Sequence, residues 1–128
     1  MKPKVLVIED NEQNLYLMTF ILEHHGYEVI PARDGAEGVA IAGKVDPVVV
    51  LLDIQLPEMD GYTVAKLLRE NSSFVRTPII AVTSYAMVGD REKAISAGCS
   101  GYIEKPINPD TFISEMEKHL RADIEDKE

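Results

Sequence analysis

Five side chains suited to metal and phosphate chemistry are spread along the sequence: Glu9, Asp10, Asp53, Thr83 and Lys105. Three carboxylates gathered in one place repel one another unless a cation compensates, and hard oxygen ligands suit Mg²⁺. An ammonium and a hydroxyl could stabilise the negative charge that phosphoryl transfer spreads over oxygens. An ionised aspartate needs no general base, so Asp53 is the natural nucleophile for a reversible acyl phosphate.

Each of these residues also has an ordinary interpretation when it is taken alone. Asp10 or Asn11 could cap the helix that follows, and Asp53 could accept hydrogen bonds from loop amides. Thr83 is a normal strand residue, and Lys105 could be a solvated surface charge. The pattern therefore carries information only if the fold brings these side chains together.

Short apolar runs rich in β-branched residues recur five times, each followed by a longer amphipathic stretch. They lie at Lys4–Ile8, Glu28–Ile30, Val48–Leu52, Ile79–Val82 and Gly101–Ile103. Near-continuous apolar strands are typical of a parallel sheet covered by helices on both faces. We predict an α/β fold with a doubly wound five-stranded parallel sheet. Ligands of such sheets bind outside the carboxyl ends of the strands, where the candidate residues fall.

Two sequence signals mark helix starts. The segment Asp34–Glu37 has the spacing of a capping box, and Asn108 followed by Pro109 predicts an N-cap before proline in the first helical position. After Asn108, one apolar stripe is formed by Phe112, Ile113, Met116 and Leu120.

The first predicted helix is more apolar than one buried stripe requires. An amphipathic helix on a sheet hides a stripe somewhat over 100° wide, so the excess is a candidate docking patch. The alternative is a helix wedged deeply between the sheet and the last helix. The apolar residues are Leu15, Tyr16, Leu17, Met18, Phe20, Ile21 and Leu22.

In order and spacing, four segments resemble response-regulator receiver domains, in particular single-domain regulators of the CheY and DivK kind. The segments are Val7–Asn11, Leu52–Gly61, Ala81–Met87 and Gly98–Pro106. The resemblance covers roughly residues 3–121. It implies a flavodoxin-like fold of five strands in the order 2-1-3-4-5 with five helices.

The resemblance also implies roles for the candidate residues. Glu9 and Asp10 are the acidic pair, Asp53 is the phosphoacceptor, and the backbone carbonyl of Gln55 completes the shell of Mg²⁺. The expected ligands of the metal are therefore Glu9, Asp10, Asp53 and Gln55.

Thr83 and Lys105 are expected to contact the phosphoryl group. Thr83 and Tyr102 form the expected switch, in which the Tyr102 ring turns inward as the hydroxyl moves toward the phosphoryl group. The family further implies a cis peptide bond between Lys105 and Pro106.

Three positions depart from the commonest pattern of the family. Glu9 replaces an aspartate, a frequent variant that preserves a water-mediated metal contact. Val48 stands where the family often carries aspartate, with a small expected effect on strand entry. The positions of Gln55 and Tyr85 flank the phosphoryl group and tune its hydrolysis rate.

The composition bounds the remaining function classes. The chain has 128 residues and a net charge of −9, which argues against direct binding to nucleic acid because that binding depends on Lys and Arg. No segment approaches the roughly 18 apolar residues of a membrane span. The single Cys99 cannot form an internal disulfide. We predict one cytoplasmic receiver domain at 1–121 and a charged tail at 122–128.

The resemblance, together with the length of the chain, implies a phosphoacceptor switch without an output domain, rather than an enzyme, with only intrinsic self-phosphorylation and self-dephosphorylation. By the same resemblance, the expected partners are a histidine kinase or a histidine phosphotransfer protein, which would dock at Asn14, Leu17 and Ile107. A downstream protein would bind the face that contains Tyr102. The protein is expected to be a monomer or a weak phosphorylation-dependent dimer.

Three alternatives remain open. The chain could be a receiver domain excised from a hybrid histidine kinase. An Asp-nucleophile phosphatase would need a second aspartate two residues after the nucleophile, where Gln55 stands. A flavodoxin-like cofactor binder would need a phosphate loop after the first strand, but the acidic run Glu9–Glu12 would repel a phosphate.

Overall fold

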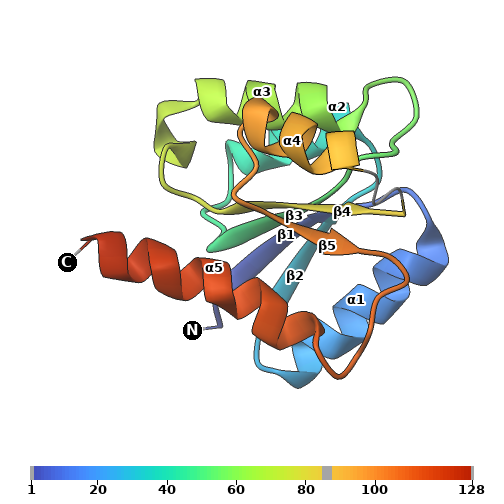
Figure 1. The fold of residues 1–128 in the computed structure, drawn as a ribbon. Helices are drawn as coiled ribbons and strands as arrows, with labels where there is room; N and C mark the ends of the chain where they lie inside the picture. Colours follow the sequence, from blue (N-terminus) through green and yellow to red (C-terminus); the bar gives the residue numbers. More distant parts are fainter. Residues whose placement is uncertain (1, 85–87, 128) are drawn as a thin grey trace.

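The computed structural model describes the backbone of residues 2–84 and 88–127, and the side chains of residues 2–84 and 89–120. A five-stranded sheet runs through the centre of the molecule (Figure 1). Its strands are β1 (Lys4–Ile8), β2 (Glu28–Ala32), β3 (Val49–Asp53), β4 (Ile79–Thr83) and β5 (Gly101–Glu104). All neighbouring strands are parallel, in the order β2-β1-β3-β4-β5. The predicted fold class and strand order are confirmed.

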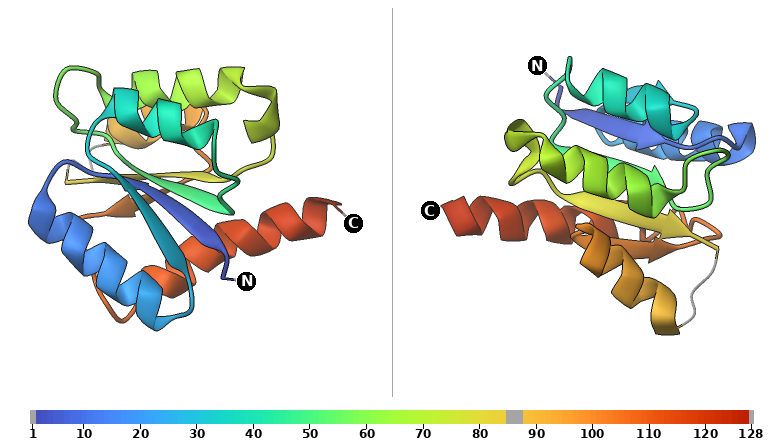
Figure 2. Two further views of the ribbon diagram at one scale, coloured as in Figure 1. Left: turned by 180° about the vertical axis from the view of Figure 1, so that it is seen from behind. Right: turned by 90° about the horizontal axis from the view of Figure 1, so that it is seen from above.

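Helices cover both faces of the sheet. α1 and α5 lie on one face, and α2, α3 and α4 lie on the other, as the views in Figures 1 and 2 show. The helices are α1 (Glu12–His24), α2 (Gly35–Ala42), α3 (Gly61–Glu70), α4 (Val88–Ala97) and α5 (Phe112–Lys127), with a short 3₁₀ helix, η1 (Ser72–Phe74), after α3. This doubly wound arrangement is the one that the apolar runs predict.

The strand side chains alternate between two hydrophobic cores. Leu6 and Leu52 belong to the core under α2, α3 and α4, whereas Val7 and Leu51 belong to the core under α1 and α5. Every residue of β3 and β4 is buried. Because full burial of one such side chain stabilises the fold by about 1.5–3 kcal/mol, the two cores hold the strands firmly in register.

Two helix starts show how local signals act in the structure. The Asp34 side chain accepts a hydrogen bond from the Glu37 amide (2.8 Å), and the Glu37 carboxylate accepts one from the Arg33 amide (3.0 Å). The predicted cap before α2 is thus confirmed. α5 begins at Phe112, three residues later than the Asn108–Pro109 signal predicts, because Asn108 caps a turn that precedes the helix.

Other boundaries also differ from the prediction. β2 extends through Pro31 to Ala32, which is possible because β2 lies at the edge of the sheet, where a proline is tolerated. α5 continues to Lys127 without a break at the predicted boundary between 121 and 122. The division of the chain into residues 1–121 and a tail remains a prediction. Within residues 2–84 and 88–127, no helix is both long and apolar enough to cross a membrane.

The apolar excess of α1 is exposed in part. Leu15, Met18, Ile21 and Leu22 are buried, but Tyr16 is 72% exposed and Phe20 is 61% exposed. Some of the excess thus faces solvent, as the first interpretation of this helix predicts.

The predicted surface role of Ile107 is wrong. Its side chain is buried in the core under α1 and α5, together with Phe112 and Met116. An apolar side chain just before α5 gains more from joining this core than from remaining in water.

Candidate functional site

The predicted site residues lie at one end of the sheet. Glu9 follows β1, Asp53 ends β3, Thr83 ends β4, and Lys105 follows β5. Ligand oxygens of Glu9, Asp10 and Asp53 all lie within 4.8 Å of one another. Parallel strands in register bring their carboxyl ends to the same edge, so residues far apart in the sequence meet here.

Glu9 and Asp10 occupy different environments although they are neighbours. Glu9 is fully buried, its amide donates to the Ala32 carbonyl (2.9 Å), and one of its carboxylate oxygens accepts from the Asn11 amide (3.2 Å). Asp10 is exposed. The cap of α1 is Asn11, whose side chain accepts from the Asn14 amide (2.9 Å). Asp10 is therefore not needed as the cap.

Asp53 is almost completely buried, with 3% of its surface exposed. Its Oδ1 accepts a hydrogen bond from the Gln55 amide (2.9 Å), which fixes the carboxylate against the following loop. Its Oδ2 lies 3.5 Å from the Lys105 ammonium. One oxygen is thus held by the backbone and the other faces a cation.

Gly61, which the sequence analysis names only as the last residue of the segment Leu52–Gly61, shapes the loop that follows Asp53. A Cβ at Gly61 would lie 2.5 Å from the Ile54 Cα and 2.8 Å from the Asp53 carbonyl oxygen. The Gly61 amide donates to the Ile54 carbonyl (3.0 Å), which closes the loop. The sequence hints at this position through the Asp60–Gly61 pair, because Asp60 is a good N-cap residue and caps α3, which begins at Gly61.

Lys105 reaches across the carboxylates from the other side of the site. Its Nζ lies 3.1 Å from Glu9 Oε1, and only 9% of its side chain is exposed. Its amide donates to the Thr83 carbonyl (2.8 Å). The peptide bond between Lys105 and Pro106 is cis, as the family resemblance implies.

The electrostatics of the site are dominated by Glu9. Burial, reinforced by the neighbouring Asp53 carboxylate, raises the pKa of Glu9 to about 7, and Lys105 acts in the opposite direction. Glu9 Oε1 forms no hydrogen bond of acceptable geometry among the described residues, although Lys105 is close. This buried oxygen can still accept a ligand bond, and it lies beside two further carboxylates. The three carboxylates together suit a hard divalent cation such as Mg²⁺.

Both predicted switch residues, Thr83 and Tyr102, lie among the described residues. Thr83 is buried, with 2% of its surface exposed, and Tyr102 in β5 is half-buried. Burial raises the pKa of the Tyr102 phenol. Tyr85, which is expected to flank the phosphoryl group, lies outside the described residues.

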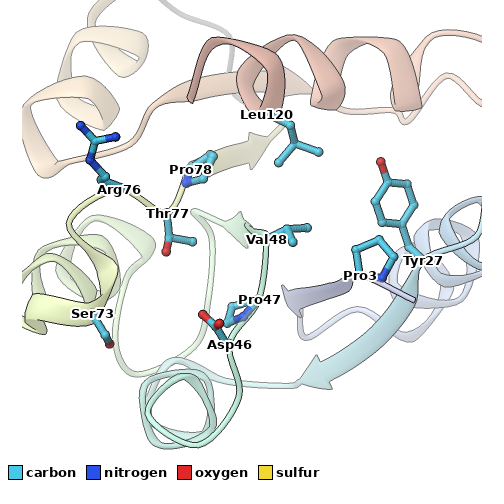
Figure 3. Close-up of a pocket in the computed structure, with 10 residues that line it drawn as sticks. All are labelled: Pro3, Tyr27, Asp46, Pro47, Val48, Ser73, Arg76, Thr77, Pro78 and Leu120. Carbon is cyan, nitrogen blue, oxygen red and sulfur yellow. The ribbon is translucent and has the colours of Figure 1, made fainter. Parts of the chain in front are cut away.

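A pocket lies at the end of the sheet where the strands begin, opposite to the carboxylates, and Figure 3 shows the residues that line it. It encloses about 450 Å³ and contains none of the predicted site residues. Val48 and Leu120 face it together with Pro3, Pro47 and Pro78. Val48, which departs from the family pattern, thus lies at the end of the sheet opposite to the carboxylates.

The sequence matches the profile of the response regulator receiver domain over residues 5–117. The chain belongs to the response regulator receiver family. Its curated relatives include the polar-differentiation response regulator DivK of Brucella ovis and of Brucella abortus. Each of these is 41% identical over 120 residues, which cover 94% of this chain and 98% of the relative.

Solved receiver structures agree with this assignment. Chemotaxis protein CheY4 of Vibrio cholerae superposes with a TM-score of 0.89 at 30% identity, over 92% of this chain and 98% of that one. The receiver domain of sensor histidine kinase PA1611 from Pseudomonas aeruginosa has a TM-score of 0.83 at 32% identity, over 95% and 97% of the two chains. That structure holds a magnesium ion in its active-site cleft.

The chain thus belongs to a family of phosphoacceptor switches in two-component signalling. The recognition made from four sequence segments is confirmed. The cluster of Glu9, Asp10 and Asp53 fits both a magnesium ion and a phosphorylated aspartate.

Proposed function

We propose that this receiver accepts a phosphoryl group onto Asp53 from a histidine kinase or a histidine phosphotransfer protein, in a Mg²⁺-dependent reaction. The observation that carries the proposal is the state of the Asp53 carboxylate. Oδ1 is held by the Gln55 amide, and Oδ2 faces the Lys105 ammonium at 3.5 Å. A carboxylate fixed in this way is preorganised for attack, because one oxygen is oriented and the other lies beside a positive charge.

Glu9, Asp10 and Asp53 would hold the magnesium ion, with the Gln55 backbone carbonyl as a further ligand. When bound, the ion supplies positive charge to neutralise the carboxylates and the phosphoryl oxygens. The pKa of Glu9, raised first by burial and then by the Asp53 carboxylate, supports this role, because a bound cation would compensate a buried negative charge. Glu9 Oε1, which has no hydrogen-bond partner among the described residues, is available as a ligand.

In the proposed transfer, an Asp53 oxygen forms a bond to phosphorus while the phosphorus–nitrogen bond of the donor phosphohistidine breaks. The electron pair of that bond goes to the leaving imidazole. Lys105 and Thr83 contact the phosphoryl oxygens and stabilise their charge. A small phosphodonor can replace the histidine, and attack by water on phosphorus later breaks the bond to Asp53 and releases phosphate.

The proposed output follows from the positions of Thr83 and Tyr102. Thr83 ends β4, and the neighbouring strand β5 carries Tyr102. Movement of the Thr83 hydroxyl toward the phosphoryl group would open space for the Tyr102 ring to turn inward. The face around β5 would then change its contacts with a downstream protein, and the receiver acts as a cytoplasmic monomer or a weak phosphorylation-dependent dimer.

Intact mass measurement with a small phosphodonor tests the proposal. The wild type should gain the mass of one phosphoryl group in the presence of Mg²⁺ and not with a chelator. Asp53→Asn should gain nothing, while Asp46→Asn, which changes an exposed carboxylate at the other end of the molecule, should behave as the wild type. A wild type that is folded and yet unmodified with Mg²⁺ would refute the proposal.

A further inference from the structure

Arg69, in the last turn of α3, makes an extensive set of hydrogen bonds at the end of the sheet opposite to Asp53. Its Nε donates to the Gly98 carbonyl (2.8 Å), and its Nη1 donates to the Thr77 carbonyl (2.7 Å) and to the Phe74 carbonyl. Its Nη2 donates to the Ser100 hydroxyl (3.1 Å). One half-buried guanidinium therefore joins α3, η1, the loop before β4 and the turn between α4 and β5.

The position of Arg69 is favourable because helix carboxyl ends meet there. α3 ends at Glu70, η1 ends at Phe74, and α4 ends just before Gly98. The carboxyl end of a helix carries partial negative charge and carbonyls without an intrahelical partner. A planar guanidinium can serve several such oxygens at once, which the point charge of a lysine cannot do.

The turn after α4 is built to fit this side chain. Gly98 has a φ of 113°, and a Cβ there would lie 2.7 Å from the Arg69 Cγ. Ser100 continues the connection, because its amide donates to the Ile79 carbonyl (2.6 Å) and its hydroxyl accepts from the Ile79 amide (3.2 Å). The turn is thus fixed to Arg69 and to the first residue of β4.

The two ends of β5 therefore have different attachments. At one end, the turn before Gly101 is held by the Arg69 hydrogen bonds. At the other end, Glu104 pairs with Thr83 and is followed by Lys105, so this end belongs to the phosphorylation site.

We propose that Arg69 is a positioning residue that keeps the turn between α4 and β5 stationary when Asp53 is phosphorylated. α4, this turn and β5 form the α4–β5 unit. When Thr83 is displaced, the unit then tilts about the fixed turn, and its contacts with α3 and β4 are kept. This regulatory role rests on the function proposed above. It explains why one side chain joins four segments beside the turn before β5, although its hydrogen bonds with them lie at the end of the sheet opposite to the phosphorylation site.

Arg69→Gln tests the proposal, with Arg76→Gln as the control because Arg76 is an exposed arginine at the same end of the sheet. Beryllofluoride with Mg²⁺ serves as the phosphoryl analogue, and amide NMR shifts of Gly101 and Tyr102 report the response. We expect Arg69→Gln to bind beryllofluoride within about twofold of wild type, because the two sites are far apart. The shifts induced at Gly101 and Tyr102 should fall by at least about half, since the unit loses its fixed end.

Hydrogen exchange gives a second readout on the same variants. The Ser100 amide should exchange at least about tenfold faster in Arg69→Gln, because local opening becomes easier. If Arg69→Gln does not fold, Arg69→Lys and Ser100→Ala remove part of the hydrogen-bond set, and each should show a smaller change in both readouts.

The outcomes separate a positioning role from a structural one. Faster exchange with unchanged beryllofluoride shifts would mean that Arg69 only stabilises the fold, and would overturn the proposal. Unchanged exchange and unchanged shifts would overturn it as well. A wild type without any beryllofluoride response would instead refute the proposed function, and the signalling role of Arg69 with it.

Discussion

Replacing Glu9 by glutamine should stabilise the metal-free protein at alkaline pH, although Glu9 belongs to the proposed metal site. The change removes one buried negative charge beside Asp53 and keeps the shape of the side chain. The other carboxylates and Lys105 stay in place. The variant therefore separates two contributions to the free energy of unfolding: the repulsion among the buried carboxylates and the stabilisation that a bound cation provides.

The size of the stability gain expected for Glu9→Gln follows from the pKa of Glu9, which is raised from 4.5 to about 7 in the folded protein. In the wild type, the folded state binds this proton more tightly than the unfolded chain does. Protonation of Glu9 therefore stabilises the wild type fully below pH 4.5, and this stabilisation is lost as the pH rises through about 7. Above that range, ionised Glu9 costs the fold about 3 kcal/mol.

The side-chain amide that Glu9→Gln introduces can serve only one of the two groups that Glu9 faces, the Asn11 amide and the Lys105 ammonium. The poorer hydrogen bonding offsets about 1 kcal/mol of the gain. The net increase in the free energy of unfolding at pH 8 is about 1–2 kcal/mol, or several degrees in melting temperature for a domain of this size.

Urea unfolding at pH 5 and pH 8, with a chelator and with Mg²⁺, measures these effects. With the chelator, the wild type should lose more stability between the two pH values than Glu9→Gln does. Mg²⁺ should stabilise the wild type more than the variant at pH 8, because it binds the ionised carboxylate. A Glu9→Gln protein that is less stable than the wild type at pH 8 without Mg²⁺ would refute the electrostatic reasoning.

Gly61→Ala should destabilise the protein by at least about 2 kcal/mol and weaken Mg²⁺ binding measured by titration, because the new Cβ meets backbone atoms of the Asp53 loop. Gly43→Ala is the matched control and should be nearly neutral, because its Cβ would meet nothing closer than 3.8 Å; an equal loss in both variants would contradict the steric account. Leu52→Ala should lower the free energy of unfolding by about 2–5 kcal/mol in urea titrations, since Leu52 is fully buried in the core, and a loss under about 1 kcal/mol would show that the packing there is loose. Phe20→Ser should change stability by less than about 0.5 kcal/mol, yet slow phosphotransfer from a histidine donor, because this exposed ring belongs to the docking patch expected on α1; unchanged transfer kinetics would exclude that role.

Much of the fold could be predicted because its signals are local and repeated. The apolar run before Asp53 is fully buried in a central strand, and a strand that must be apolar on both faces of a sheet leaves a clear pattern. The convergence of Glu9, Asp53 and Lys105 followed from the rule that ligands bind at the carboxyl ends of parallel strands.

The features that the sequence did not reveal depend on contacts between distant segments. Ile107 could be assigned to the surface or to the core only by knowing how closely α5 packs on the sheet. Arg69 resembles any charged residue in the last turn of a helix until the turn at Gly98 is placed beside it. Gly61 likewise gains its role from the backbone of Ile54, a contact that no spacing rule predicts.

Pro31 lies in β2, the strand at one edge of the sheet, and it has no amide hydrogen to offer. A strand from another molecule that tried to extend the sheet along this edge would meet a gap in its ladder of hydrogen bonds. The other edge is formed by β5, which is only four residues long and ends in the charge of Glu104. Short, charged or proline-containing edges discourage strand addition. Both borders of the sheet therefore disfavour edge-to-edge association between molecules.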